Sequence, residues 1–184
     1  MSHMELLAPL PARQRSLAPA LARLIDEIDT ACADGATMGE RIVAALEQAA
    51  AQRNFLTAEQ RAPQDGCYAR HPIYGDPAGR FTIVAIVWGA RQFSPIHAHH
   101  AWCAYAVCEG ELQETLYAWD AKRGRAWAAS TGNRSPGYGC YAHAGLDQIH
   151  RLGNPGPDVA ISLHVYGVER ERVSTHVNRV VQTA

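Results

Sequence analysis

Histidines gather in one short stretch, residues 94–119, that otherwise has the composition of β-strands. His97 and His99 are separated by one residue, and alternate side chains of a strand point to the same face. Two imidazoles side by side could supply half of a metal site, because neutral imidazole is the commonest metal ligand. The alternative is a pair of structural histidines without metal. His100 would face the other way, and we expect it to be a surface or hydrogen-bonding residue.

Two further histidines lie in segments that could reach the same site. His150 stands in GLDQIHRLGN, just before a turn, and His164 stands in DVAISLHVYGV, an apolar run typical of a strand. Taken singly, a histidine on a strand is more often a hydrogen-bonded structural residue than a ligand. Their spacing alone therefore leaves both roles open.

The elements that must position these histidines change character along the chain. Roughly the first sixty residues have helical periodicity, with apolar residues at Leu21, Leu24, Ile25 and Ile28. Thr37 with Glu40, and Thr57 with Gln60, have the spacing of helix-capping boxes.

From about residue 66 the sequence predicts strands and turns. RFTIVAIVW, residues 80–88, is too hydrophobic throughout for a half-exposed strand, and Glu109-Gly110-Glu111 separates two apolar segments like a hairpin turn. We interpret residues 130–139 as a long connection between strands. The fold class predicted is mainly β, a barrel or sandwich with an N-terminal helical segment. Residues 1–65 would pack on a core of residues 66–184, in one domain overall.

Composition and charge exclude several classes of protein. The chain has 184 residues and a formal net charge of −1, with no basic run for nucleic acid and no long apolar stretch for a membrane. Five cysteines, an odd number without a CxxC pair, argue against a disulfide framework and favour a reducing cytoplasm. We expect a monomer. MSHM resembles a vector remnant ahead of Met4, so His3 is left out of the metal site.

Two motifs resemble those of the cupin superfamily. Gly89, His97, His99 and Gly110 fit the first motif, and GYGCYAHAGLDQIHRLGN is similar to the second, which contains His150. Cupins usually have a glutamate midway between the histidine pair and the closing glycine, but here that region is HAWCAYAV. The resemblance therefore implies a cupin barrel whose metal site has three histidines and no acid. Such a neutral face suits a substrate that binds the metal as an anion, such as a thiolate.

More of the chain, roughly residues 66–167, resembles the cysteine dioxygenase family. Four motifs agree in order: the Tyr-x-Arg of Tyr68 and Arg70, the segment 80–103, IHRLGN, and the Ser-x-His-x-Tyr of AISLHVY. The resemblance implies that His97, His99 and His150 hold Fe(II). It also implies an outer-sphere hydrogen-bond chain of Ser162, His164 and Tyr166, whose alternation on one strand agrees with that role.

The resemblance also implies a reaction, the oxidation of a thiol to a sulfinic acid by O₂. Arg70, helped by Tyr68, would bind the carboxylate of L-cysteine, since an arginine at this position is similar to the cysteine-oxidising members. The segments PIHAHHAWCAYAVCEG and LHVYG are more similar to a bacterial branch in which 3-mercaptopropionate enzymes are common. Ala98 also departs from the aspartate that the family usually has between the two histidines. The alternatives are a dioxygenase for another thiol acid, such as 3-mercaptopropionate or mercaptosuccinate, and a cupin that binds metal or ligand without catalysis.

Cys103 has two interpretations. It stands as far before Gly110 as the cysteine that forms a thioether crosslink to the active-site tyrosine in mammalian-type members of the family. The resemblance thus makes Cys103 a candidate crosslink partner of Tyr166 and not an iron ligand. The other interpretation is a small buried thiol. Cys108 has no predicted role.

Overall fold

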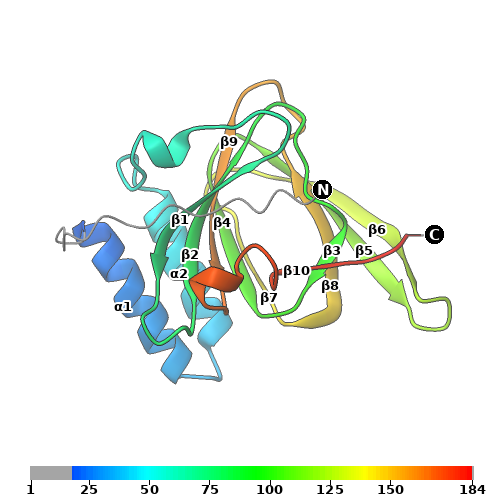
Figure 1. Ribbon diagram of the computed structural model, residues 1–184, viewed down its shortest axis with the longest axis horizontal. Coiled ribbons are helices and arrows are strands. Elements are labelled where there is room, and N and C mark those ends of the chain that lie inside the picture. The colour runs from blue at the N-terminus through cyan, green and yellow to red at the C-terminus, as the bar shows by residue number, and fades with distance from the viewer. Residues whose placement is uncertain (1–17, 184) are drawn as a thin grey trace.

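The computed structural model describes residues 18–183, in which two five-stranded antiparallel sheets face each other (Figure 1). The order in the first sheet is β1 (Ala69–Gly75), β2 (Thr82–Trp88), β9 (Ala160–Tyr166), β4 (Cys103–Glu109) and β7 (Gly139–Ala142). The order in the second sheet is β10 (Asn178–Val180), β3 (His97–His99), β8 (Gly145–Gly153), β5 (Leu112–Asp120) and β6 (Arg125–Arg134). The mainly β fold predicted from the sequence is confirmed.

Two helices, α1 (Pro19–Ala33) and α2 (Met38–Ala50), cover the outer face of the first sheet. Short 3₁₀ turns, η1 (Glu59–Arg61) and η2 (Arg170–Arg172), precede β1 and follow β9. The predicted boundary at residue 65 falls in the segment between η1 and β1.

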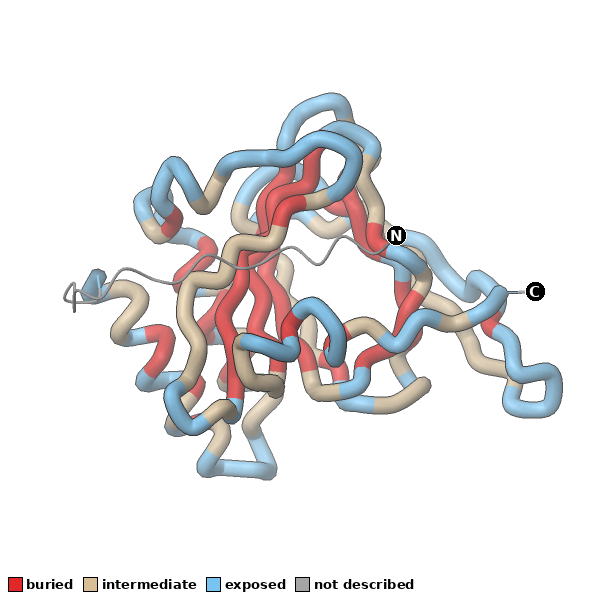
Figure 2. Tube along the Cα trace, viewed as in Figure 1, coloured by how far each residue is buried: buried red, intermediate tan, exposed pale blue. Residues whose placement is uncertain are grey.

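Every residue of β2 is buried, because the strand has apolar neighbours on both sides. Ile83, Ala85 and Val87 pack against the helices, whereas Val84, Ile86 and Trp88 face the space between the sheets. The middle strands of the first sheet are red along most of their length in Figure 2. A strand buried on both faces needs a continuous apolar run and not an alternating one, which explains the composition of residues 80–88.

Small residues on the outer face of the first sheet let α2 approach closely. Ala104 and Ala106 of β4 belong to the cluster that includes the helices. A Cβ atom at Gly139 of β7 would lie 2.6 Å from Cγ1 of Val43 on α2. A larger residue at Gly139 would therefore push α2 away from the sheet.

The sequence expectations for the local elements had mixed outcomes. The capping box at Thr37 is wrong, because the Thr37 hydroxyl donates to Asp34 instead of capping α2. The box of Thr57 and Gln60 is confirmed by hydrogen bonds in both directions, at 3.0 and 3.3 Å. The expected connection 130–139 is also wrong in its first half: β6 continues to Arg134, because residues 112–120 of β5 offer a pairing partner along its whole length.

Other expectations concern the chain as a whole. The MSHM segment and His3 lie outside the described residues. All five cysteines are free thiols. Within residues 18–183, every helix is too short or too polar to cross a membrane.

Arg80 connects the turn between β1 and β2 to α1. Its guanidinium donates to Asp76 at 2.8 Å and to Asp29 of α1 at 2.6 Å. The hydrogen bonds from Arg80 lower the pKa of Asp76 from 3.8 to about 2. A carboxyl group with a lowered pKa stabilises the fold above its ordinary pKa, and this contribution is lost as the pH falls through the lowered value.

We therefore expect Asp76→Asn to lower the free energy of unfolding by on the order of 1 kcal/mol at neutral pH. The difference from the wild-type chain should shrink as the pH falls from about 4 to 2. Urea unfolding at several pH values measures both. Asp147→Asn, at an exposed carboxylate, is the control. A loss of stability that stays constant across this pH range would contradict the role of the ion pair.

Candidate metal centre

Three buried histidines meet between the two sheets. His97 and His99 come from β3 and His150 from β8, and their candidate ligand atoms lie within 4.8 Å of one another. His97 and His150 are direct partners in the pairing of β3 with β8. The structure thus places the two histidines of the HxH pair on one face, as predicted, and adds His150 across the strands. His100 is exposed, as expected.

The buried environment keeps two of these imidazoles neutral. Burial, followed by the proximity of His150, lowers the pKa of His97 to about 3 and that of His99 to about 2. A neutral imidazole has a free lone pair, so both rings can bind a metal at neutral pH. The cluster of three imidazoles, with these two held neutral, is chemically suited to a divalent cation.

The outer nitrogens of the rings show which lone pairs are free. Nδ1 of His97 lies 2.9 Å from the carbonyl oxygen of Pro95, and Nδ1 of His150 lies 2.7 Å from Oε1 of Glu114. Both partners are acceptors, so each Nδ1 carries the proton and each Nε2 has the lone pair. Nδ1 of His99 is buried with no hydrogen-bond partner among the described residues. The donor set therefore fits a metal that prefers nitrogen ligands, with two tautomers already fixed.

Ser162, His164 and Tyr166 form a hydrogen-bond chain on one face of β9. Ser162 Oγ lies 2.8 Å from Nε2 of His164, and Nδ1 of His164 lies 3.1 Å from the Tyr166 hydroxyl. The chain begins at Trp88, whose indole N–H donates to Ser162 at 2.9 Å. The three residues thus lie as predicted, and Trp88 is a fourth member that the sequence reasoning missed.

Only the first hydrogen bond of this chain has a fixed direction, because the indole N–H of Trp88 can only donate. The other two follow the tautomer of His164: either Ser162 donates to Nε2 and Nδ1 donates to the Tyr166 oxygen, or both directions are reversed. In the first arrangement the phenolic hydrogen of Tyr166 is free to point elsewhere. Burial lowers the pKa of His164 and raises that of Tyr166, so both are neutral at neutral pH.

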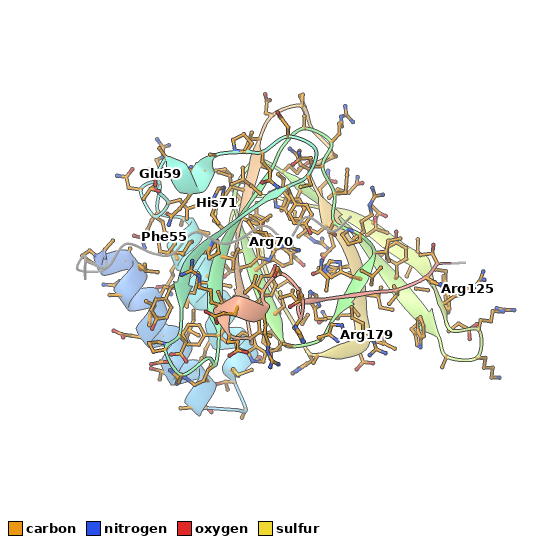
Figure 3. All side chains as sticks on the ribbon, in the orientation of Figure 1. Phe55, Glu59, Arg70, His71, Arg125 and Arg179 are labelled. Atoms are coloured by element: carbon orange, nitrogen blue, oxygen red, sulfur yellow. The ribbon has the colours of Figure 1, made fainter. Side chains whose placement is uncertain are left out.

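Tyr166 and the three clustered histidines line a common cavity with about 330 Å³ of empty space, partly open to solvent. Arg70 of β1 lines the same cavity, and Figure 3 shows it in the middle of the molecule, unlike the peripheral Arg125. Its Nη2 donates to the Tyr68 hydroxyl at 2.8 Å, and its Nε is buried without a partner among the described residues. A buried guanidinium N–H with no acceptor is costly, so this end of the cavity is suited to an anion.

Cys103 is buried, and its strand position puts it directly opposite Tyr166 in the pairing of β4 with β9. Side chains of such a pair have Cβ atoms about 4.5–5.5 Å apart, and both residues line the cavity. Cys103 is not among the clustered ligands. Cys108 is half-buried and packs in the cluster on the helix side of the sheet.

Glu114 of β5 is a site residue that the sequence reasoning missed. It is 2% exposed and contacts His150, although it lies outside the ligand cluster. Residues 100–107 contain no acid, so the sequence predicted a site without a carboxylate. The available signal was the alternation of β5, because Leu112 and Glu114 share a face and an acid on the apolar face of a strand needs a partner.

The chain is similar to known proteins in sequence. The family described as Cysteine dioxygenase type I matches residues 4–176. The Cysteine dioxygenase type 1 of Homo sapiens is 29% identical over 92 residues, which cover 48% of this chain and 45% of that protein. That of Danio rerio is 26% identical over 127 residues and covers 62% of each protein. The chain thus spans between about half and two thirds of the length of these relatives.

It is also similar in fold to a solved structure, an uncharacterized conserved protein with a double-stranded beta-helix domain from Klebsiella pneumoniae subsp. pneumoniae MGH 78578. The TM-score is 0.50 at 19% identity, and the match covers 65% of this chain and 92% of the other. At this identity the likeness concerns the fold alone. It agrees with the mainly β barrel or sandwich that the sequence predicts.

The cluster yields a direct prediction about metal binding. We expect His97→Ala to reduce the bound divalent metal from one equivalent to a small fraction of that, since two imidazoles make a poor site. His100→Ala, three residues away and exposed, should keep full loading. Metal analysis after loading with Fe(II) under anaerobic conditions measures both. Full loading of the His97 variant would mean that the cluster is not the metal site.

Proposed function

The chain belongs to the cysteine dioxygenase type I family, and from this premise we propose that it is a non-haem Fe(II) dioxygenase that converts the thiol of L-cysteine to the sulfinic acid. The observation that carries the proposal is one cavity with three clustered, buried imidazoles and a buried guanidinium N–H without an acceptor. The reaction, RSH + O₂ → RSO₂H, uses both oxygen atoms and requires no external reductant.

His97, His99 and His150 would hold the iron through nitrogen atoms. Iron bound there would supply the positive charge that keeps the substrate sulfur as a thiolate and the electron chemistry that O₂ requires. A ligand set of histidines without a carboxylate would leave the positive charge of the metal uncompensated, and an anionic thiolate substrate would compensate part of it. This donor set therefore favours a thiol over a neutral substrate.

Arg70 and Tyr68 would bind the substrate carboxylate. The guanidinium has its Nε free for one hydrogen bond, and the Tyr68 oxygen accepts from Arg70, so the phenolic hydrogen of Tyr68 is available for a second. A charge-assisted pair of this kind orients the substrate as well as binding it. The sulfur of a short thiol acid would then be directed from Arg70 towards the histidines.

Tyr166 would hold its hydroxyl hydrogen towards the reacting atoms. With the proton of His164 on Nδ1, the chain from Trp88 through Ser162 and His164 would donate a hydrogen bond to the Tyr166 oxygen and so fix where the phenolic hydrogen points. Fixed dipoles of this kind stabilise developing charge without reorganising during the reaction. Apolar side chains such as Ile86 and Leu152 line the cavity beside these dipoles and lower the polarity around them.

Other thiol acids remain the second candidate, because a carboxylate at Arg70 is common to L-cysteine, 3-mercaptopropionate and mercaptosuccinate. Ala98, the residue between the two ligands, packs with Ala126 and Ile149 on the other side of β3 and does not line the cavity. Its departure from the family pattern is therefore a weak argument about the substrate. The geometry at Arg70 supports any of the three acids.

We also propose that Cys103 and Tyr166 become joined by a thioether bond between sulfur and the phenol ring. Their direct pairing and shared cavity support it. The bond removes one hydrogen from each residue, and O₂ at the site would be the oxidant.

Two expectations from the sequence stay proposals. We propose a cytoplasmic location, in line with five cysteines that form no disulfide. We also propose that the protein is a monomer.

A thiol panel tests the function. We expect the iron-loaded chain to consume O₂ with L-cysteine and to form a product heavier by two oxygen atoms, measured by an oxygen electrode and mass spectrometry. If another thiol acid in the panel is turned over faster, that acid and not L-cysteine is the substrate. Absence of turnover with every thiol would favour a non-catalytic binding protein.

Arg70→Met should lower kcat/KM about 100-fold for a thiol acid, because a charge-assisted, bidentate contact is lost. Cysteamine, which has no carboxylate, should be turned over equally by both proteins. Arg125→Met, at the periphery in Figure 3, is the control. Equal losses with the acid and with cysteamine would argue against a carboxylate at Arg70.

The crosslink has its own measurement. We expect the mass of the intact protein, after turnover, to fall by two hydrogens, with the change mapping to peptides that contain Cys103 and Tyr166. Cys103→Ala and Tyr166→Phe should each abolish the change, whereas Cys108→Ala should not. An unaltered mass after many turnovers would leave Cys103 as a buried thiol.

A further inference from the structure

Glu114 is a buried carboxylate in the wall of the barrel. It is 2% exposed and lies on β5, on the same face as the apolar Leu112. A carboxylate in such a place is strongly unfavourable unless both oxygens have partners. The neighbouring residues must therefore supply hydrogen bonds or positive charge to both oxygens of Glu114.

Both oxygens of Glu114 are hydrogen-bonded. Oε1 accepts from Nδ1 of His150 at 2.7 Å, and Oε2 accepts from Nε of Arg134 on β6 at 2.9 Å. The guanidinium of Arg134 lies over the ring of Tyr138, 4.5 Å from its centre, which limits its movement. Arg134 thus holds the carboxylate in place and leaves one oxygen for the histidine.

Strand register brings Glu114 to His150. β5 pairs with β8 so that Glu114 is opposite Leu152 and Leu116 is opposite His150. Glu114 is therefore the diagonal neighbour of His150 on the shared face, within reach of a long side chain. No turn or loop is involved, so the contact is as rigid as the sheet.

The three clustered histidines differ in what their outer nitrogens contact. His150 donates to a carboxylate, His97 donates to the carbonyl oxygen of Pro95, and Nδ1 of His99 has no partner among the described residues. A histidine that donates to a carboxylate is a stronger ligand, because the negative charge increases the basicity of the other nitrogen. The cluster is thus electronically unequal, with His150 the strongest donor.

We propose that Glu114, held by Arg134, is the outer-sphere carboxylate of the metal centre. It fixes the orientation of His150 with Nε2 towards the metal, and through this hydrogen bond it supplies a negative charge that a ligand set of three histidines lacks. This inference rests on the metal-binding part of the proposed function. Glu114 acts through His150 and touches no substrate, so it is a positioning residue.

The competing explanation is a structural ion pair, in which Glu114 and Arg134 serve only to join β5 and β6. The two explanations differ in the metal-bound protein. A structural pair affects the stability of the fold in the absence of metal, whereas an outer-sphere carboxylate affects the affinity and the ligand field of the metal in a folded protein.

The main test is Glu114→Gln, which keeps an oxygen to accept from His150 but removes the charge. A second variant, Glu114→Gln with Arg134→Met, avoids leaving the guanidinium without a partner and protects against misfolding. We expect both to bind Co(II) and Fe(II) about 10–100-fold more weakly than the wild-type chain in chelator competition. Glu111→Gln, at an exposed glutamate that accepts from Asn133, should bind as the wild type does.

Two further readouts separate the role from a structural one. The visible spectrum of the Co(II)-loaded protein should change in both Glu114 variants, and the Fe(III)/Fe(II) potential should become more positive, because a nearby negative charge favours Fe(III). Arg134→Met alone, which keeps the carboxylate, should retain most of the affinity.

A folded double variant with wild-type affinity, Co(II) spectrum and potential would overturn the inference and leave the proposed function intact. A wild-type chain that binds neither Fe(II) nor Co(II) would overturn both. Weaker metal binding by Glu114→Gln together with unchanged binding by Glu111→Gln would support the outer-sphere role.

Discussion

Strand β9 is buried on both faces, and its register determines both the packing of the helices and the chemistry of the cavity. Ile161, Leu163 and Val165 pack in the cluster beneath α1 and α2, while the alternate residues form the polar chain that ends at Tyr166. A shift of one residue would exchange the two sets and put a histidine and a serine against the helices. The apolar contacts on the outer side therefore hold the polar residues on the inner side in place.

Burial has opposite consequences for the two ends of the cavity. At the histidine end, it removes the positive charge from His97 and His99 and so leaves their lone pairs free for a metal. At the other end, burial leaves Nε of Arg70 without an acceptor among the described residues. Neutral donors at one end and an unmatched cation at the other suit a ligand with two acidic groups, a thiol and a carboxylate.

The carboxylate of this site is displaced from the place where cupins usually have it. The stretch after His99 contributes Cys103 in place of an acid, and the nearest carboxylate to the cluster comes from the following strand, behind His150. A first-sphere acid would take one metal position and part of the metal charge, whereas Glu114 leaves the inner face neutral and open. Under the proposed function, this arrangement would give a metal more room for its substrate.

The sequence by itself determined what depends on local backbone geometry. The two-residue period of a strand put His97 and His99 on one face and aligned Ser162, His164 and Tyr166, and an uninterrupted apolar run marked β2 as buried on both sides. The resemblance to a family added His150. Contacts across strands were decided by the tertiary structure: the donation of His150 to Glu114 and the pairing of Cys103 with Tyr166. These contacts depend on the register between segments far apart in the chain, which is set by the packing of both sheets and the helices and has no local signature.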